Sequence, residues 1–233
     1  MSMKLEVGVA PTGAPNSLAG RLDSLRERIA ESALRAGRDP RSIALVGITK
    51  QHSRETILEA LAAGLGDIGE NYLQEAREKY IALPPVRKHF VGHVQTNKAR
   101  AIVELFDVVQ SIDRLDAGRA IGKAQRELGK RMRTLVQINI SPSERFGVAP
   151  ADAPELARRL REDEDLEVDG VMAIGPLTED RAEIARAFEC AARTFEKVGG
   201  STLSLGMSAD WPEAVAHGST MLRIGTALFG ARA

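Results

Sequence analysis

The chain has 233 residues, and its 32 basic and 32 acidic side chains cancel, so bulk charge predicts no attraction to nucleic acid or to an anionic membrane. Hydrophobic residues make up 43% and charged residues 27%, an ordinary globular composition that leaves ample material for a core. A lone cysteine excludes an intramolecular disulfide and a thiolate metal cluster, and with no signal peptide or membrane-spanning apolar run it predicts a soluble, cytoplasmic protein.

The first predicted element is a flexible leader over residues 1–16, in which glycine and proline recur. Residues 18–36 then carry apolar side chains at helical spacing, which predicts an extra N-terminal helix. Short apolar runs follow, each predicted to be a strand: Ile43–Thr49, Asp67–Gly69, His89–Gly92, Val108–Ser111, Thr134–Ile140, Leu166–Ile174, Thr202–Leu205 and Met221–Ile224. Amphipathic segments between them predict helices, chiefly Glu55–Ala63, Leu115–Leu128, Ala153–Arg161 and Glu183–Val198.

This alternation predicts an α/β fold. Apolar strands that are buried on both faces indicate a parallel sheet covered by helices. Eight strand–helix units favour a closed (β/α)8 TIM barrel, because closure removes the exposed edges of an open sheet. An open doubly wound sheet is the alternative, but no glycine-rich dinucleotide fingerprint follows the first strand. Without a linker or a break in composition, residues 17–233 are predicted to form one domain.

Lys50 is the first candidate site residue. Active sites of such barrels form at the C-terminal ends of the strands, and Lys50 comes directly after the first apolar run. Its amine would therefore lie at the barrel mouth, where it suits Schiff-base chemistry. A solvated lysine that begins a loop is the competing interpretation of this position.

The last two strand ends are rich in small and hydroxylated residues. Barrels often bind phosphate there, and Ser208 with the Gly225–Thr226 pair is well placed to do so. Tight turns alone would also explain these residue types. Arg223, near the end of the last strand, is expected to be buried and so to need a partner.

No metal or nucleic-acid site is predicted. His89 and His93 are four residues apart, but on a strand their imidazoles would lie about 13 Å apart, too far to share an ion. Cys190 falls within a predicted helix and is interpreted as a small buried residue. The chain has no basic stretch interleaved with aromatic residues, as nucleic-acid binding would need.

A set of short stretches at the strand ends is highly specific when taken together: Ile48–Lys50, Gly69–Glu75, His89–Lys98, Gln110–Asp113, Val136–Ser141, Gly170–Ile174, Ser204–Asp210 and Gly218–Arg232. In these stretches the chain resembles the YggS/PROSC family of pyridoxal phosphate homeostasis proteins, over nearly its whole length. The resemblance implies a barrel like the N-terminal domain of alanine racemase, with pyridoxal 5′-phosphate (PLP) as the cofactor. By this resemblance Lys50 would hold PLP as an internal aldimine.

The resemblance also implies roles for the other candidate residues. Asn71 would lie beside the cofactor ring, and Ser208, Gly225 and Thr226 would hold the phosphate. Arg223 would face the pyridine nitrogen. An arginine cannot accept a proton from that nitrogen, so the ring would stay largely unprotonated and act as a weak electron sink. We therefore expect a binding protein in vitamin B6 homeostasis without catalytic turnover, with apo PLP-enzymes as recipients.

Two enzymatic functions remain as alternatives. A PLP-dependent amino-acid racemase would need a second acid/base group opposite Lys50, and the two tyrosines, Tyr72 and Tyr80, both fall in the predicted helix after the second strand. Alanine racemases take that tyrosine from a second domain of a partner subunit. The chain ends at Ala233 without such a domain, so a monomer is expected. A Schiff-base aldolase that uses Lys50 on a phosphorylated sugar is the other alternative.

The chain departs from the family pattern in three places. Thr49 stands where serine is usual, and Gly175 is inserted before Pro176. After the fifth strand, Glu144–Gly147 replaces the usual residues and would alter a loop at the barrel mouth. None of the three departures falls on a residue expected to hold the cofactor.

Overall fold

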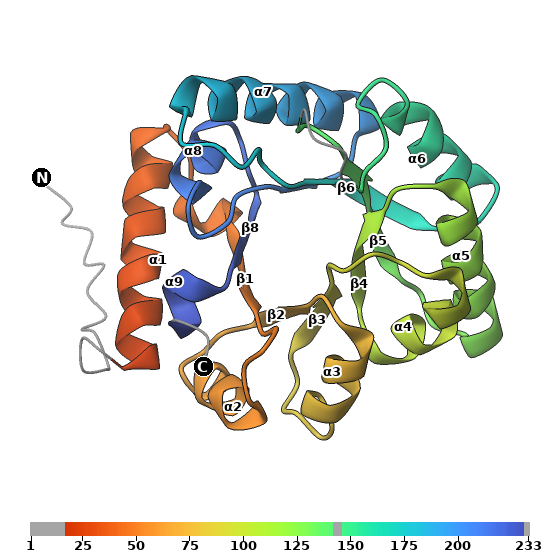
Figure 1. The fold of residues 1–233 in the computed structure, drawn as a ribbon, viewed down its shortest axis with the longest axis horizontal. Helices are drawn as coiled ribbons and strands as arrows, with labels where there is room; N and C mark the ends of the chain where they lie inside the picture. The colour runs from red at the N-terminus through yellow and green to blue at the C-terminus, as the bar shows by residue number, and fades with distance from the viewer. Residues whose placement is uncertain (1–16, 142–145, 231–233) are drawn as a thin grey trace, which may run out of the picture.

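A closed parallel barrel forms the centre of the computed structural model, which describes residues 17–141 and 146–230 (Figure 1). Each strand pairs with the next in chain order, and β8 closes on β1. The strands are β1 Ala44–Ile48, β2 Asp67–Glu70, β3 Arg87–Phe90, β4 Val108–Ile112, β5 Arg133–Ile138, β6 Glu167–Ala173, β7 Thr202–Ser204 and β8 Met221–Ile224. The predicted (β/α)8 barrel is confirmed. The predicted leader, residues 1–16, lies outside the described residues, as do Glu144 and Arg145.

Helices surround the barrel and cover its outer face (Figure 1). They are α1 Leu18–Arg35, α2 Arg54–Ala62, α3 Leu73–Lys79, α4 Ala99–Leu105, α5 Leu115–Leu128, α6 Ala153–Glu162, α7 Arg181–Val198, α8 Trp211–Ala216 and α9 Thr226–Phe229, with short 3-10 turns at Pro40–Ser42 and Thr96–Lys98. Side-chain caps set several helix starts: the Ser17 hydroxyl accepts from the Gly20 N–H, and Asp180 caps α7 in the same way. No helix in the described part of the chain is long and apolar enough to cross a membrane.

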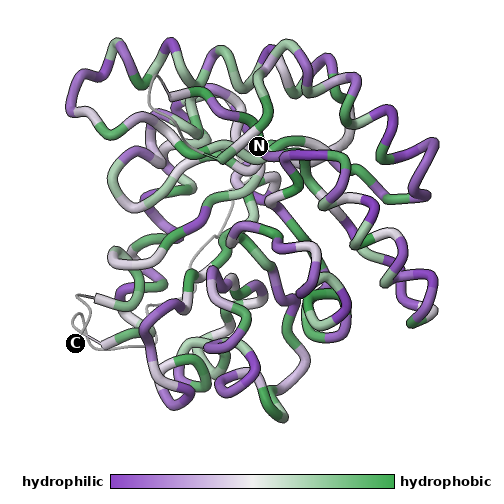
Figure 2. The backbone as a smooth tube through the Cα atoms, turned by 45° about the vertical axis from the view of Figure 1, so that its right-hand side comes forward, coloured by the Kyte–Doolittle hydropathy of each residue, from purple (hydrophilic) through white to green (hydrophobic). Residues whose placement is uncertain are grey.

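The apolar core has two parts. The larger one lies between the strands and the helices and includes the fully buried Phe106 and Phe188. A small second cluster, Val46, Ile48 and Met221, comes from β1 and β8. Figure 2 shows hydrophobic and hydrophilic residues alternating along the outer helices, as expected where one helix face packs on the barrel.

The structure differs from the predicted elements in detail. The third strand begins at Arg87 and ends at Phe90, so Gly92 and His93 belong to the loop that follows it. The short helices α4, α8 and α9 were not predicted, because four to seven residues give too little periodicity. Cys190 is only half-buried, which corrects its predicted burial. The buried face of α7 carries Phe188 and Ala191 instead, and Cys190 falls to one side of that face.

Candidate functional site

Lys50 and Asn71 occupy equivalent places on neighbouring strands. In the β1–β2 ladder Ile48 pairs with Gly69, so Lys50 and Asn71 each stand two residues beyond that pair, at the C-terminal end of the barrel. Lys50 is half-buried in a turn, and the next residue, Gln51, has a left-handed backbone with φ of 62°. The two residues thus stand at the same side of the barrel mouth.

A buried polar cluster behind this turn holds its main chain. We call Thr49, Glu70, Glu75, Lys79 and Tyr80 the outer network. The Lys79 ammonium donates to the Thr49 carbonyl oxygen at 2.9 Å, to Glu70 Oε2 at 2.9 Å and to Glu75 Oε2 at 2.6 Å. The Thr49 hydroxyl lies 2.9 Å from the Tyr80 hydroxyl and 3.1 Å from Glu70 Oε2. Threonine therefore makes, with its hydroxyl, every contact that a serine could make at this position.

The carboxylates of the outer network connect it to both candidate residues. Glu75 Oε2 accepts from the Gln51 N–H at 2.9 Å, which fixes the strained turn after Lys50. The fully buried Glu70 accepts from the Asn71 N–H at 2.8 Å and the Tyr72 N–H at 3.2 Å. Burial raises the pKa of Glu75, but its bonds with Lys79 and the Gln51 N–H outweigh this, so its pKa lies below the usual range. Both carboxylates thus act as fixed hydrogen-bond acceptors for main-chain N–H groups.

Asn71 also depends on a close approach by the β3–α4 loop. A Cβ added to Gly92 would lie 1.9 Å from the Asn71 carbonyl oxygen, so only glycine fits there. Beyond it, the His93 ring stacks on Phe146 with centroids 4.0 Å apart. Phe146 belongs to the loop in which the sequence departs from the family pattern, and it is 61% exposed. A groove of about 500 Å³ runs from Asn71 past His93 between α3 and α4.

Ser208, Gly225 and Thr226 meet at the start of α9. The Ser208 hydroxyl accepts from the Ala227 N–H at 3.2 Å. Thr226 is the first residue of α9, and Gly225 precedes it. Among the described residues a Cβ added to Gly225 would meet only Ile48, at 3.8 Å, so packing against this part of the chain does not demand glycine there. Small residues beside backbone N–H groups and a hydroxyl can let an oxyanion approach closely.

Arg223 lies within β8, level with Val46 of β1, and is 5% exposed. Its Nη1 donates to the Ser204 hydroxyl and its Nη2 to the Ala173 carbonyl oxygen, both at 2.7 Å. No carboxylate among residues 17–141 and 146–230 makes an ion pair with it. Burial lowers the pKa of Arg223 to about 10, and the charge of Asp210 partly offsets that effect. At neutral pH the site therefore contains a buried cation with unused donors, which suits a ligand with an acceptor atom.

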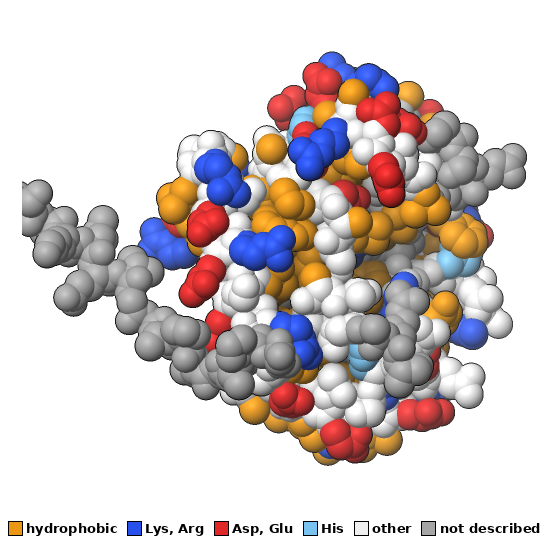
Figure 3. Space-filling view, turned by 60° about the vertical axis from the view of Figure 1, so that its left-hand side comes forward, with side chains coloured by type: hydrophobic (Ala, Val, Ile, Leu, Met, Phe, Trp, Pro, Cys, Tyr) orange, Lys and Arg blue, Asp and Glu red, His pale blue; other side chains and the backbone are white. Residues whose placement is uncertain are grey.

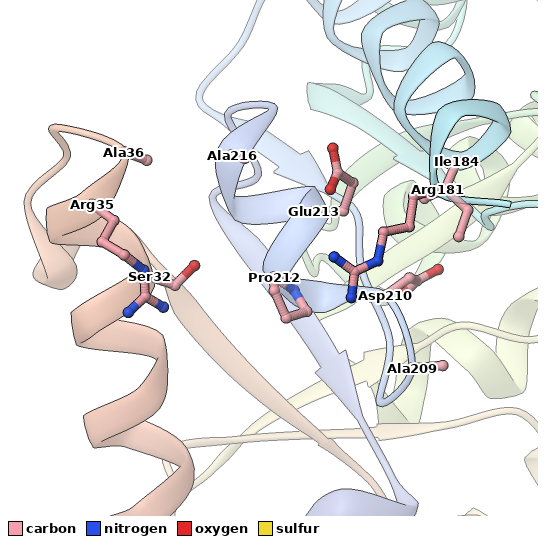
Figure 4. Close-up of a pocket in the computed structure, with 10 residues that line it drawn as sticks. All are labelled: Ser32, Arg35, Ala36, Arg181, Ile184, Ala209, Asp210, Pro212, Glu213 and Ala216. Atoms are coloured by element: carbon pink, nitrogen blue, oxygen red, sulfur yellow. The ribbon is translucent and has the colours of Figure 1, made fainter. Parts of the chain in front are cut away.

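Asp210 shapes the turn that carries Ser208. Its carboxylate accepts from the Met207 N–H at 2.6 Å, and burial raises its pKa against the effects of that bond and of Arg223. A Cβ added to Gly175 would lie 2.7 Å from Asp210 Oδ2, which explains why glycine is needed at this second departure. Asp210 also lines an outer groove of about 360 Å³ between α1 and α8, into which Arg181 reaches (Figure 4).

The two histidines of the third predicted strand have separate surroundings. His89 lies inside the barrel against Asp67 and Gln110, whereas His93 stacks on Phe146 at the mouth. In the described ranges no group of three or more His, Cys, Asp or Glu side chains could hold a metal ion. On the face drawn in Figure 3, acidic and basic side chains are interspersed with apolar ones, in keeping with the balanced composition.

Comparison with known proteins agrees with this geometry. The sequence profile of the alanine racemase N-terminal domain matches residues 21–233. The pyridoxal phosphate homeostasis protein of Pseudomonas aeruginosa is 41% identical over 226 residues, which cover 93% of this chain and 96% of the relative. The protein of that name from Escherichia coli K12 is 38% identical over 231 residues, 93% and 97% of the two chains. This chain belongs to the pyridoxal phosphate homeostasis protein family.

Solved structures extend the comparison for this family member. PipY of Synechococcus elongatus, determined with PLP bound, has a TM-score of 0.80 and 35% identity, covering 92% of this chain and all of PipY. Alanine racemase of Clostridium difficile has a TM-score of 0.67 but only 13% identity, over 87% of this chain and 55% of its own. That second likeness shows the shared barrel fold alone.

Most of the residues that hold the candidate site residues in place were not predicted from the sequence. Glu75 and Lys79 lie four residues apart on α3, a spacing typical of a helical ion pair, so this signal was available. Ser204 and Phe146 gave none, because their partners Gln110 and His93 lie on distant parts of the chain.

Proposed function

We propose that this protein binds PLP covalently through Lys50 and stores it, keeping the free aldehyde low in vitamin B6 homeostasis without catalytic turnover. The names of the relatives and the PLP in the PipY structure support the ligand. The observation that carries the proposal is the buried Arg223 guanidinium, which has no carboxylate partner in the described ranges and lies on the strand next to β1 and Lys50. Apo PLP-enzymes in the cytoplasm would be the recipients.

Each candidate residue then has a distinct task. PLP supplies an aldehyde that condenses with a primary amine, with loss of water. Lys50 would provide that amine from the end of β1, and Asn71, at the equivalent place on β2, would lie beside the ring. Ser208, Gly225 and Thr226 bind the phosphate with a hydroxyl and backbone N–H groups at the start of α9. Arg223 donates to the ring nitrogen.

The side chains around the site favour storage over racemisation. Arg223 donates hydrogen bonds and keeps the ring nitrogen unprotonated, which weakens the ring as an electron sink. Racemisation also needs a second acid/base group. The Tyr80 hydroxyl is buried against Thr49, and burial raises its pKa far above the usual range. Tyr72 is 55% exposed at the start of α3, and its main chain is held by Glu70.

The test is an absorption spectrum of the purified protein before and after borohydride, followed by peptide mapping. We expect a visible band that reduction fixes onto Lys50. Lys50→Ala should abolish the attachment and change the free energy of unfolding by no more than about 1 kcal/mol, because Lys50 is only half-buried. Lys98→Ala, at a lysine that lines the groove beside Asn71, is the control and should keep the band.

Two results would contradict the proposal. A colourless protein that takes up no added PLP would require another phosphorylated ligand for the site around Ser208. A loaded protein that interconverts amino-acid enantiomers at enzymatic rates would replace storage by racemisation. Reduced PLP found on Lys98 instead of Lys50 would reject only the assignment of Lys50 as the attachment site, and would leave PLP binding itself in place.

A further inference from the structure

A continuous chain of polar side chains runs through the barrel interior to Arg223. Arg223 Nη1 is 2.7 Å from Ser204 Oγ, which is 2.6 Å from Gln110 Oε1. Gln110 Nε2 is 2.9 Å from His89 Nδ1, and His89 Nε2 is 2.9 Å from Asp67 Oδ1. We call these five residues the inner chain. Its members come from β8, β7, β4, β3 and β2, so it crosses the barrel from one wall to the other.

The hydrogen atoms of the inner chain can be placed from the donors alone. A guanidinium only donates, so Ser204 Oγ accepts from Arg223 and gives its own proton to Gln110 Oε1. The Gln110 amide then donates to His89 Nδ1, which leaves the His89 proton on Nε2 and directs it to Asp67. Every donor points the same way, from the cation to the carboxylate.

The reverse orientation of the Gln110 amide would be costly. Its nitrogen would then face Ser204, and its oxygen would require a proton on His89 Nδ1. His89 would carry protons on both nitrogens, because Nε2 still faces the Asp67 carboxylate. The imidazole is fully buried, so this would place a further charge inside the barrel. The unidirectional arrangement needs only the two charges at its ends.

The stability of the fold alone does not require this arrangement. Barrel interiors of this kind are usually filled by branched apolar side chains, and a buried polar chain gains nothing over apolar packing. At the other end, Asp67 accepts from Arg87 at 3.2 Å, near the N-terminal rim. Near the mouth, Asp210 attracts Arg223 electrostatically, yet the two form no ion pair. The Ser204 hydroxyl therefore holds the guanidinium away from the position that attraction to Asp210 alone would favour.

We propose that Ser204, Gln110 and His89 are positioning residues that fix the Arg223 guanidinium against the pyridine nitrogen of the bound cofactor. This inference rests on the proposed function and adds three residues to it. The negative end of the chain at Asp67 polarises each bond toward Ser204, which makes the hydroxyl a stronger acceptor for Arg223. With Nη1 and Nη2 each held by one bond, the guanidinium has a fixed orientation, and its remaining N–H donors would be available to a ring nitrogen.

The experiment compares two identical substitutions at equally buried hydroxyls. Ser204 and Ser219 are both fully buried, but Ser219 bonds only to main-chain oxygens such as that of Leu205, outside the inner chain. We expect Ser204→Ala to weaken PLP binding roughly tenfold and to shift the pH titration of the bound chromophore. Ser219→Ala should lower the melting temperature similarly but change the PLP dissociation constant by less than about twofold.

A second variant acts further along the chain. His89→Phe removes the acceptor for Gln110 and the donor to Asp67 while filling a similar volume, and should weaken PLP binding about threefold. It carries the test alone if Ser204→Ala fails to fold. Because Ser204 and His89 act through one chain, the double variant should lose less affinity than the product of the two single losses.

The outcomes separate this inference from the function beneath it. If the wild-type protein shows no band fixed on Lys50, the proposed function and this inference are both rejected. The wild type could carry PLP while Ser204→Ala and Ser219→Ala change the PLP affinity and the chromophore titration to the same extent. The inner chain would then be structural only. An unchanged spectrum in His89→Phe with an altered one in Ser204→Ala would confine the positioning role to Ser204.

Discussion

The outer network and the inner chain support the two ends of the candidate site in opposite ways. The outer network, behind β1 and β2, forms hydrogen bonds with main-chain atoms: the Thr49 carbonyl oxygen and the N–H groups of Gln51 and Asn71. The inner chain, inside the barrel, grips a side chain, because its last bond is to the Arg223 guanidinium. One network fixes where the chain turns, and the other fixes where a functional group points.

This difference fits the tasks proposed for the two residues. A lysine that captures and releases an aldehyde must move its amine, so only its backbone should be held. An arginine that faces a ring nitrogen works best when its donors are already in place. The outer network is also built from residues close in sequence, whereas the inner chain joins residues up to 156 positions apart, from Asp67 to Arg223. Damage to the first should be local, and damage to the second should reach across the barrel.

The largest effect is expected from removing the cation of the outer network. Lys79→Met would leave the fully buried Glu70 with three hydrogen bonds but no counter-charge, and should cost about 3 kcal/mol of unfolding free energy. Lys79 itself is 11% exposed. Urea unfolding of the cofactor-free protein measures the loss.

The control for this substitution is an exposed lysine. Lys123 pairs with Glu127 at 3.8 Å on the surface of α5, so Lys123→Met should change stability by less than about 0.5 kcal/mol. Equal losses at the two lysines would mean that the outer network stabilises the fold no more than a surface ion pair does.

A smaller effect is expected at the far end of the inner chain. Burial raises the pKa of Asp67, but its contacts with His89 and Arg87 outweigh that effect, so its pKa lies below the usual range. Asp67→Asn should cost about 1.5 kcal/mol at neutral pH, because a charged acceptor is lost.

The pH dependence of that difference follows from the lowered pKa. The contribution of Asp67 is fully present above its unfolded value and is lost as the pH falls through the lower folded value. Urea midpoints of wild type and Asp67→Asn at pH 7, 5, 4 and 3 should therefore converge only at the acidic end. A gap that stays constant down to pH 3 would show that the charge of Asp67 is not what stabilises the chain.

The smallest effect is expected at the edge of the outer network. Tyr80→Phe removes the hydroxyl that bonds to Thr49 and should cost about 1 kcal/mol, because Thr49 keeps its bonds to Gly69 and Glu70. Thermal melts measure the loss, and the PLP content should match that of the wild type. A variant that folds normally but binds less PLP would place Tyr80 in the site and revive the acid/base alternative.

The sequence predicted the barrel well because most of its strands contain a short apolar run. All eight strands lie where runs were identified, and β8 has the predicted ends, Met221 and Ile224. The ends of β3 were wrong because Arg87 and Lys88 are polar, yet they pair with Asp67 and Ile68 of β2. Tertiary pairing decides such residues, and local hydrophobicity does not reveal it.

The candidate site was predictable only in part. The rule that sites form at strand ends placed Lys50, Asn71 and Ser208 at the mouth, and the expected burial of Arg223 with partners is confirmed. Their roles toward the cofactor stay predictions. The inner chain could not be read from the sequence, because neither the direction in which a strand side chain points nor its partner on another strand follows from local pattern.

The attachment of α1 to α9 has a consequence for how the protein is made. Arg21 Nε donates to the Leu228 carbonyl oxygen at 2.7 Å, although 207 residues separate the two. During synthesis α1 emerges first and must wait for α8 and α9 before it can pack, since chains leave the ribosome N-terminus first. The proposed phosphate-binding end at Ser208 and Thr226 therefore forms later than any other part of the described barrel. A nascent chain would display Lys50 long before it could retain a phosphorylated ligand, so loading should begin only after translation has passed α9.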